Sequence, residues 1–278
     1  MQRVLITGGH GMLGTALREC RPDDCQLLVV DLEELDVAAP DAVNRCFAEF
    51  APRVVIHCAA MTDVDGCERD PTAAERTNVQ GTANVAAACG ESVRLVHIST
   101  DFVFDGRARR PYHEGDPAAP VNVYGRTKLA AEERVRELAP NHAIARTAWT
   151  FAPWGRNFVR AILQAAREHG HLRVVDDQVG SPTYAPDSAV AIWQLAAVDA
   201  RGVFHVVNSG VVSRHEFARE IVAAAGMAHV PVEPIGSADL AQPAQRPAFS
   251  ALANTRLPAL RPYREALRDC VARLHDRA

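Results

Sequence analysis

Cysteine pairing is the first thing that this sequence lacks. Its seven cysteines are odd in number, widely spread and never spaced as Cys-x-x-Cys. A disulfide framework needs paired cysteines and a structural zinc site needs closely spaced ligands, so the sequence predicts neither. Free thiols fit a reducing compartment, and we therefore expect a cytoplasmic protein. The cysteines are Cys20, Cys25, Cys46, Cys58, Cys67, Cys89 and Cys270.

Long apolar runs and an excess of one charge are also missing. No stretch approaches the length of a transmembrane helix, and residues 1–7 lack the charged start and apolar stretch of a signal peptide. The 30 basic and 34 acidic residues leave a net charge of -4. This balance gives no general reason to expect nucleic acid or an anionic membrane as a partner. The sequence predicts a soluble protein in which any bound anion is held by individual residues of its site and not by the overall charge.

Metal-ligand spacing is absent as well. The eleven histidines include no His-Glu-x-x-His pattern. His169-x-His171 is more typical of an exposed helix end than of a metal site. We therefore expect no catalytic metal.

What the sequence does contain is an alternation of short β-branched runs with helical segments. With 278 residues, of which 48% are hydrophobic, the chain can bury a large core. The alternation predicts an α/β fold with a Rossmann-like, doubly wound parallel sheet. We place a dinucleotide-binding domain at 1–150 and a smaller substrate-binding lobe at 151–278, with some segments returning to the first domain. Strands are expected at 4–6, 27–30, 54–56, 95–98, 143–146 and 202–207, and later helices at 157–168, 186–198 and 214–225.

Three glycines, Gly8, Gly11 and Gly14, follow the first expected strand and open the first expected helix. Glycine lets the backbone turn tightly and approach phosphates without a Cβ in the way, and a helix amino end attracts a pyrophosphate. The first spacing is two residues, where the common fingerprint has one. The motif predicts a dinucleotide cradle, with a plain strand-to-helix turn as the alternative.

Asp31 ends the second apolar run, at about the distance from the glycines where a carboxylate reaches the adenosine ribose. Residues 32–44 contain no Lys or Arg to neutralise a 2′-phosphate, while Glu33, Glu34 and Asp36 would repel one. The segment therefore favours NADH over NADPH. The alternative is that Asp31 only caps a turn.

The most informative pattern is Tyr124-x-x-x-Lys128 downstream of Ser99-Thr100-Asp101. On a helix, Lys128 emerges from the same face as Tyr124, one turn later. A nearby cation is expected to lower the pKa of the phenol, which suits acid/base work. Thr100 closes the fourth expected strand at the sheet edge where α/β folds bind ligands, so it can donate a hydrogen bond to a carbonyl. By chance the same spacing would mean a half-buried tyrosine beside a solvated lysine, and Asp101 could equally bind a sugar hydroxyl or cap a turn.

With these residues, the chain resembles the extended short-chain dehydrogenase/reductases, and within them the dTDP-4-dehydrorhamnose reductase family. The similarity runs nearly from end to end. Its most specific segments are Ser-Thr-Asp and Gln-x-Gly-Ser-Pro-Thr. The matching segments are 59–65, 99–106, 124–130, 146–149, Asn157-Phe158, 177–183 and Arg246-Pro247.

The resemblance implies reduction of the 4-keto group of dTDP-4-dehydro-L-rhamnose by NADH or NADPH, giving dTDP-L-rhamnose. It implies that Tyr124 donates the proton, that Lys128 clamps the cofactor ribose, and that Thr100, Asp101 and Trp149 contact the sugar. The implied cofactor contacts are Gly11, Met12 and Leu13 at the pyrophosphate, Asp31, Asp36 and Val37 at the adenosine, and Ala59, Ala60 and Met61 at the middle of the dinucleotide. A homodimer, with a cation at the subunit contact, is compatible with the resemblance.

Four later residues are further candidates for substrate binding. Arg246 suits the substrate diphosphate because a guanidinium meets phosphate oxygens in a bidentate way; the alternative is a surface arginine beside a proline turn. Gln178 and Ser181 could bind nucleotide or sugar, or serve the turn around Gly180. Asn157 could bind the substrate through its side-chain amide or cap a helix.

Three departures from the family pattern leave the sugar open: Met61, the pair His57-Cys58, and the pair Thr150-Phe151. An alternative function is therefore a ketoreductase or epimerase acting on another nucleotide sugar. A second alternative, from a different class, is a regulatory protein that binds cofactor without turnover. This one would have to explain why Tyr124, Lys128 and Thr100 are all present.

Overall fold

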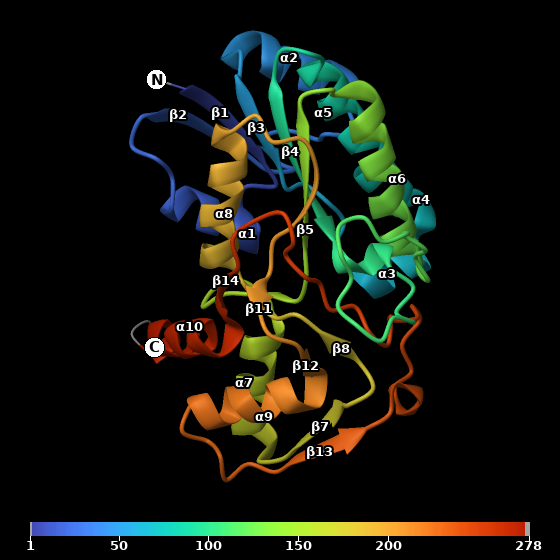
Figure 1. Cartoon of the computed structure of the whole chain (residues 1–278), viewed down its shortest axis with the longest axis vertical. Helices are drawn as coiled ribbons and strands as arrows, with labels where there is room; N and C mark the ends of the chain where they lie inside the picture. The colour runs from blue at the N-terminus through green and yellow to red at the C-terminus, as the bar shows by residue number, and fades with distance from the viewer. Residues whose placement is uncertain (1, 276–278) are drawn as a thin grey trace.

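A parallel sheet of six strands forms the upper part of the molecule in Figure 1. The computed structural model describes residues 2–275. The spatial order of the strands is β10-β5-β4-β3-β1-β2. Their bounds are β1 Gln2–Thr7, β2 Cys25–Val30, β3 Val54–His57, β4 Arg94–Thr100, β5 His142–Thr147 and β10 Gly202–His205.

The order of the strands reverses at β1, which pairs with β2 on one side and β3 on the other. The chain therefore winds outward from β1 in both directions, and the carboxyl ends of all six strands meet at one edge. In folds of this kind ligands bind at that edge, near the point of reversal. The expected doubly wound parallel sheet is confirmed.

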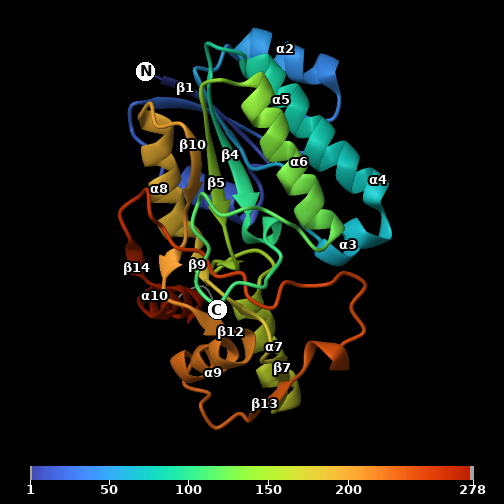
Figure 2. The same ribbon diagram turned by 45° about the vertical axis from the view of Figure 1, so that its right-hand side comes forward.

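Helices cover both faces of the sheet (Figure 2). One face carries α1 (Met12–Glu19) and α8 (Ala185–Ala197), and the other carries α2 (Pro40–Phe50), α5 (Gly81–Cys89) and α6 (Val123–Leu138). Successive strand side chains point to opposite faces. Val4 and Ile6 accordingly join the core under α1 and α8, while Leu5 joins the core on the other side.

A smaller lobe lies below the sheet in Figure 1. Its core is aromatic: Phe217 packs on Phe151, Phe158 and Tyr263. Tyr263 begins a last helix, which is not among the helices expected above. The elements are α7 (Phe158–His169), α9 (Arg214–Ala224), α10 (Tyr263–His275) and the short paired strands β6 (Thr150–Phe151) with β9 (Thr183–Tyr184), β7 (Leu172–Val175) with β13 (Val232–Ile235), β8 (Val179–Gly180) with β12 (Val212–Ser213), and β11 (Asn208–Ser209) with β14 (Leu260–Pro262).

The chain crosses back between the two parts. After β9 it forms α8, which packs on the large sheet, and β10, which is an edge strand of that sheet. It then enters β11 and α9. Trp154, in the loop after β6, donates from its indole N–H to the carbonyl of Met12, 3.0 Å away, in the glycine loop. Short elements complete the chain: α3 (Val64–Arg69), α4 (Pro71–Ala74), the π-helix η1 (Glu75–Gln80), and the 3₁₀ turns η2 (Asp101–Val103) and η3 (Ser237–Asp239).

Candidate active site

Tyr124 lies in the first turn of α6. The helix begins at Val123 because Asn122 caps it: the side-chain oxygen of Asn122 accepts from the N–H of Gly125 at 2.8 Å. The same amide donates to the carbonyl of Gln245 at 2.7 Å. The cap therefore joins the start of α6 to a loop more than a hundred residues later.

Gly125 lets α6 press against the turn that follows β4. A Cβ added at Gly125 would come within 2.1 Å of the carbonyl oxygen of Phe102. The rings of Phe102 and Tyr124 then meet edge to face, with centroids 5.8 Å apart. Close approach at this glycine brings Tyr124 to the carboxyl end of β4, where Thr100 lies.

Thr100 and Asp101 form one hydrogen-bonded unit at the end of β4. The Thr100 hydroxyl donates to Asp101 Oδ1 at 3.1 Å, and the Ser250 hydroxyl donates to Asp101 Oδ2 at 2.5 Å. Asp101 is only 2% exposed, and burial raises the pKa of its carboxyl to about 6. Asp101 does not cap η2. The Thr100 hydroxyl does so, accepting from the N–H of Phe102.

The phenol of Tyr124 holds its proton more tightly than expected. Burial raises its pKa, and the nearby Asp101 carboxylate raises it further, against a hydrogen bond with Thr100 that lowers it. The expected lowering by Lys128 is therefore wrong for this arrangement, because desolvation of the phenol outweighs it. A phenol that stays protonated at neutral pH is suited to donate a proton.

Lys128 lies behind Tyr124, buried against β4. Its ammonium donates to the carbonyl of Ile98 at 2.7 Å and lies 3.4 Å from Nε2 of His97. Burial lowers the pKa of this amine to about 8, and Glu132, one turn further along α6, opposes that shift. Lys128 is the only lysine in the chain. The hydrogen bond to Ile98 therefore fixes the position of this ammonium behind Tyr124.

Asn78 is a site residue that the motif search missed. It is fully buried in η1, and it both donates to the carbonyl of Met61 and accepts from its N–H, at 3.1 and 2.7 Å. It also donates to the Thr127 hydroxyl on α6 at 3.0 Å. The only signal for Asn78 in the sequence is that an amide side chain stands just before an alanine-rich helix, Gly81–Cys89. Asn78 ties the loop after β3 to α6, and Met61 and Tyr124 pack against the same small apolar cluster.

The glycine loop between β1 and α1 has the form expected of a phosphate cradle. Gly8 has φ 65°, and a Cβ there would lie 2.6 Å from the backbone nitrogen of Ala59, so the loops after β1 and β3 are in contact. Gly14 packs directly on Gly9. α1 begins at Met12, and no side chain caps its amino end at Gly11. The first N–H groups of α1, including that of Leu13, are thus left for an anion.

The adenosine candidates lie at the ends of β2 and the segment after it. Asp31 accepts from the N–H of His10 at 2.8 Å, which ties β2 to the glycine loop. Asp36 forms an ion pair with Arg76 at 2.5 Å, so the fold supplies a basic residue that residues 32–44 lack. The side chain of Val37 is buried in the core. Ala59, Ala60 and Met61 are half-buried after β3, beside this region.

The late substrate candidates are not all directed into the site. Asn157 caps α7, accepting from Arg160, and donates to backbone carbonyls of its own loop. Gln178 donates to Ser237, and the Ser181 hydroxyl accepts from the N–H of Leu252. Each of these side chains has a structural partner.

Arg246 is held by Asp65. Its two terminal nitrogens donate to the two carboxylate oxygens at 2.6 and 2.7 Å, and one of them also donates to the carbonyl of Ala244. The pair joins the segment around 246 to α3. Trp149 follows β5, and Arg214 at the start of α9 stacks on its ring. Arg214 is a second residue that sequence reasoning missed; no motif contains it.

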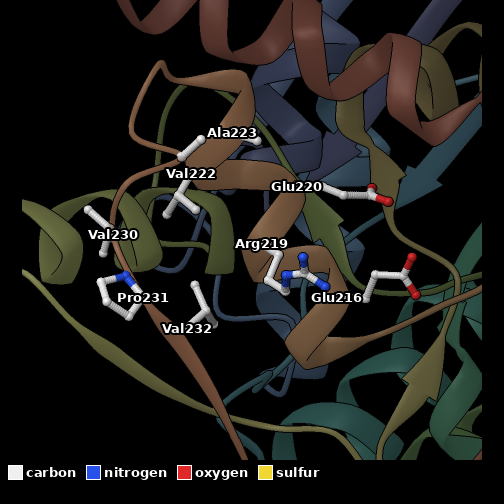
Figure 3. Close-up of a pocket in the computed structure, with 9 residues that line it drawn as sticks. Glu216, Arg219, Glu220, Val222, Ala223, Val230, Pro231 and Val232 are labelled. Atoms are coloured by element: carbon white, nitrogen blue, oxygen red, sulfur yellow. The ribbon is translucent and has the colours of Figure 1, made fainter.

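Among residues 2–275, no group of three or more His, Cys, Asp or Glu side chains is arranged to hold a metal ion. Every helix in this range is too short or too polar to span a bilayer. The hollow in Figure 3, of about 440 Å³, lies between α9 and residues 228–232, and neither Tyr124 nor Lys128 lines it.

Known proteins resemble this chain over its whole length. The family model described as "RmlD substrate binding domain" matches residues 1–276. A dTDP-4-dehydrorhamnose reductase of Mycobacterium tuberculosis is 39% identical over 98% of this chain and 93% of its own length. A probable dTDP-4,6-dihydroxy-2-methyloxan-3-one 4-ketoreductase of Streptomyces antibioticus is 37% identical over 96% of this chain and 94% of its own. The structure of a dTDP-4-dehydrorhamnose reductase of Bacillus anthracis in complex with NADP has a TM-score of 0.95 and 35% identity, covering 98% of this chain and 100% of that one.

Proposed function

Because the chain belongs to the dTDP-4-dehydrorhamnose reductase family, that of the RmlD substrate binding domain, we propose that it reduces the 4-keto group of dTDP-4-dehydro-L-rhamnose to give dTDP-L-rhamnose. It is a nicotinamide-dependent oxidoreductase of the extended short-chain dehydrogenase/reductase type. The regulatory alternative is set aside, because the relatives are reductases and the catalytic trio is complete. A homodimer and a cytoplasmic location stay predictions of the sequence.

One observation carries the proposal: the structure brings the Tyr124 phenol, the Thr100 hydroxyl and the Asp101 carboxyl together at the carboxyl end of β4. When bound, the nicotinamide cofactor supplies a hydride to the carbonyl carbon. Thr100 would then turn its hydroxyl proton from Asp101 to the carbonyl oxygen, and Tyr124 would donate the proton that turns this oxygen into a hydroxyl. The raised pKa of Tyr124 supports this direction of transfer, because the phenol is protonated before reaction.

Lys128 and the glycine loop would hold the cofactor. The uncapped amino end of α1 fits a pyrophosphate, and the Lys128 ammonium lies beneath the carboxyl end of β4 with the Ile98 carbonyl as its close partner. Lys128 therefore orients the ribose and keeps a positive charge beside the reacting centre. Asn78 fixes the distance between the Met61 loop and α6.

NADH is the preferred cofactor in this proposal. The Asp31 carboxylate is fixed at the glycine loop, where it would accept from the ribose hydroxyls and repel a 2′-phosphate. Arg76 weakens the argument drawn from residues 32–44, because it lies in this region. Its charge is balanced by Asp36, however, so a phosphate would have to compete with a carboxylate for it.

The test is oxidation of NADH and of NADPH, followed by absorbance, with dTDP-4-dehydro-L-rhamnose generated in the same tube. The product is identified by mass and NMR. Formation of dTDP-L-rhamnose with a higher kcat/KM for NADH is the expected result. Oxidation with a different product would overturn the substrate, and a higher kcat/KM for NADPH would overturn only the role of Asp31.

A second candidate is reduction of another deoxysugar nucleotide at a keto group. The Streptomyces antibioticus relative, a probable 4-ketoreductase for a different dTDP-sugar, favours it. Both candidates use the same trio, so a panel of dTDP-4-keto sugars under identical conditions separates them.

A further inference from the structure

The guanidinium of Arg214 packs on two aromatic rings, and no residue among 2–275 accepts a hydrogen bond from it. Its guanidinium carbon lies 3.5 Å from the centre of the Trp149 ring and 4.9 Å from that of Phe158. Stacking uses the face of a guanidinium and leaves its N–H groups pointing outward from the edge. Among residues 2–275, no carbonyl, carboxylate or hydroxyl accepts from these N–H groups. The donors are available to a ligand.

The electrostatic position of Arg214 is unfavourable without an anion. It is the first residue of α9, and the amino end of a helix repels a cation. It is partly desolvated, and the Arg246 guanidinium lies near enough to disfavour its charge. Asp101 opposes these effects from a distance, without a hydrogen bond. An anion in contact with Arg214 would offset the cost of burying its charge and the repulsion from Arg246.

The backbone around the stack is built to hold it. Trp149 has φ 43°, a left-handed conformation that is rare and strained for a bulky residue. Gly180 lies against the indole, where a Cβ would come within 2.4 Å of Cε2. The N–H of Arg214 donates to the carbonyl of Gln178 at 3.0 Å, and the N–H of Thr183 donates to that of Trp149 at 3.3 Å. Residues 178–183 therefore support the stack from below.

Arg246, the other candidate for an anion, is already engaged. Both of its terminal nitrogens donate to Asp65, and Asp65 also accepts from the N–H of Ala244. A phosphate at Arg246 would have to displace a bidentate ion pair that is largely buried. Arg214 offers a whole guanidinium edge with nothing to displace.

We propose that Arg214 binds the sugar-linked phosphate of the nucleotide-sugar substrate, and that Arg246 acts as a clamp on its own loop. This inference rests on the proposed function, since it requires a nucleoside diphosphate sugar in the site. A phosphate presents two oxygens to the fork of the guanidinium. The Asp101 carboxyl, which forms a hydrogen-bonded unit with Thr100, is close enough to Arg214 to act on its charge. Because Arg214 covers one face of the Trp149 ring, a substrate that approaches this face meets the edge of the guanidinium.

The experiment compares the binding of dTDP and thymidine by calorimetry, with NADH saturating so that the cofactor site is filled. Arg214→Gln is expected to weaken dTDP binding by about 10- to 100-fold and to leave thymidine within about twofold, since only dTDP carries the phosphates. Arg214→Lys keeps the charge but loses the fork, so its affinity for dTDP should lie between those of wild type and Arg214→Gln. Arg256→Gln is the matched control, because Arg256 also stacks on a ring, 4.2 Å from the centre of Phe204, at the far edge strand β10.

Unchanged dTDP affinity in Arg214→Gln would overturn the assignment, and so would an equal loss for thymidine, which signals collapse of the pocket. The far-UV spectrum and melting temperature of each variant show whether it is folded. If the wild-type protein reduces dTDP-4-dehydro-L-rhamnose but Arg214→Gln binds dTDP as tightly as wild type, the role of Arg214 is overturned and the proposed function stands. A specific loss of dTDP binding, in a protein that does not reduce this sugar, supports Arg214 and overturns the sugar instead.

Discussion

The two sides of the site are built in different ways. The proton-donating side, as we propose it, consists of Tyr124 and Lys128 on one turn of α6 and Thr100 at the end of the adjacent strand β4. The proposed diphosphate side consists of Trp149, Arg214 and the loop clamped by Arg246, which come from three separate segments. The first side depends on regular secondary structure, and the second depends on contacts between remote parts of the chain.

This difference bears on what each side can tolerate. On the proton-donating side, helix and strand geometry place the groups, and Gly125 and Asn78 set how closely α6 approaches its neighbours. On the diphosphate side, the strain at Trp149 is offset by packing and hydrogen bonds from residues 178–183. We expect substitutions on the proton-donating side to lower kcat, and substitutions on the diphosphate side to weaken substrate binding.

Replacing Tyr124 with Phe tests the contrast most strongly. The variant keeps the ring but loses the proton, so kcat should fall by about 10²- to 10⁴-fold while NADH binds nearly normally. Tyr112→Phe is the control, since this buried tyrosine donates to Asp105 outside the site and should alter stability rather than chemistry. Near-normal turnover by Tyr124→Phe would show that another group supplies the proton.

Replacing Gly125 with Ala should have the next largest effect. A Cβ 2.1 Å from the Phe102 carbonyl forces α6 away from β4, and such overpacking costs about 1 to 3 kcal/mol of unfolding free energy. Because Tyr124 moves with the helix, kcat should fall as well. The matched control is Gly115→Ala, where nothing lies within 4 Å of the added Cβ. Equal melting temperatures for the two variants would contradict the close approach.

Asp101→Asn tests the charge shared by the two sides. The pKa of Asp101 is raised to about 6 from 3.8, so the native state binds a proton that the unfolded state releases. Its contribution to stability is present below pH 4 and lost as the pH rises through 6, a change of roughly 3 kcal/mol. Relative to wild type, Asp101→Asn should therefore be more stable at pH 7 than at pH 4, as measured by urea unfolding. A difference that does not change with pH would show that the native and unfolded pKa values are equal.

The titration of Lys128 gives the smallest expected effect and can be read directly. Since it is the only lysine, ¹³C,¹⁵N-lysine labels this one residue, and its ¹³Cε shift should titrate near pH 8 in the folded protein and near 10.5 in urea. The ammonium is lost as the pH rises through 8, so kcat/KM for NADH should fall about tenfold per unit above that value. The same decline in Lys128→Met would show that another group is responsible.

Much of the fold was predictable because it follows from local patterns. The five strands expected before residue 150 agree with β1 to β5 within a few residues, and the helices expected at 157–168, 186–198 and 214–225 agree with α7, α8 and α9. The helix α10 and the π-helix η1 were missed. The apolar residues of α10 recur at helical spacing, at Tyr263, Leu267, Cys270, Val271 and Leu274, so its pattern was present in the sequence. The π-helix η1 has no such local pattern.

The site was predictable in part for the same reason. Tyr124, Lys128, Thr100 and Asp101 lie in motifs whose spacing already implies a shared helix face and a shared sheet edge. Arg214 belongs to no motif, and the partners of Asn157, Gln178 and Ser181 are backbone and side-chain groups that only the folded chain brings near. A residue type that suits a ligand suits a loop contact equally well.

By itself the sequence determined the order of strands and helices, the glycine turn, and the four-residue spacing of Tyr124 and Lys128, because these depend on periodicity and on what glycine permits. The tertiary structure decided which arginine is free. Arg246 is paired with Asp65, 181 residues away, and Arg214 is stacked on Trp149. It also decided that the phenol keeps its proton, because the pKa of a buried group is set by how much water and charge the surrounding chain leaves beside it.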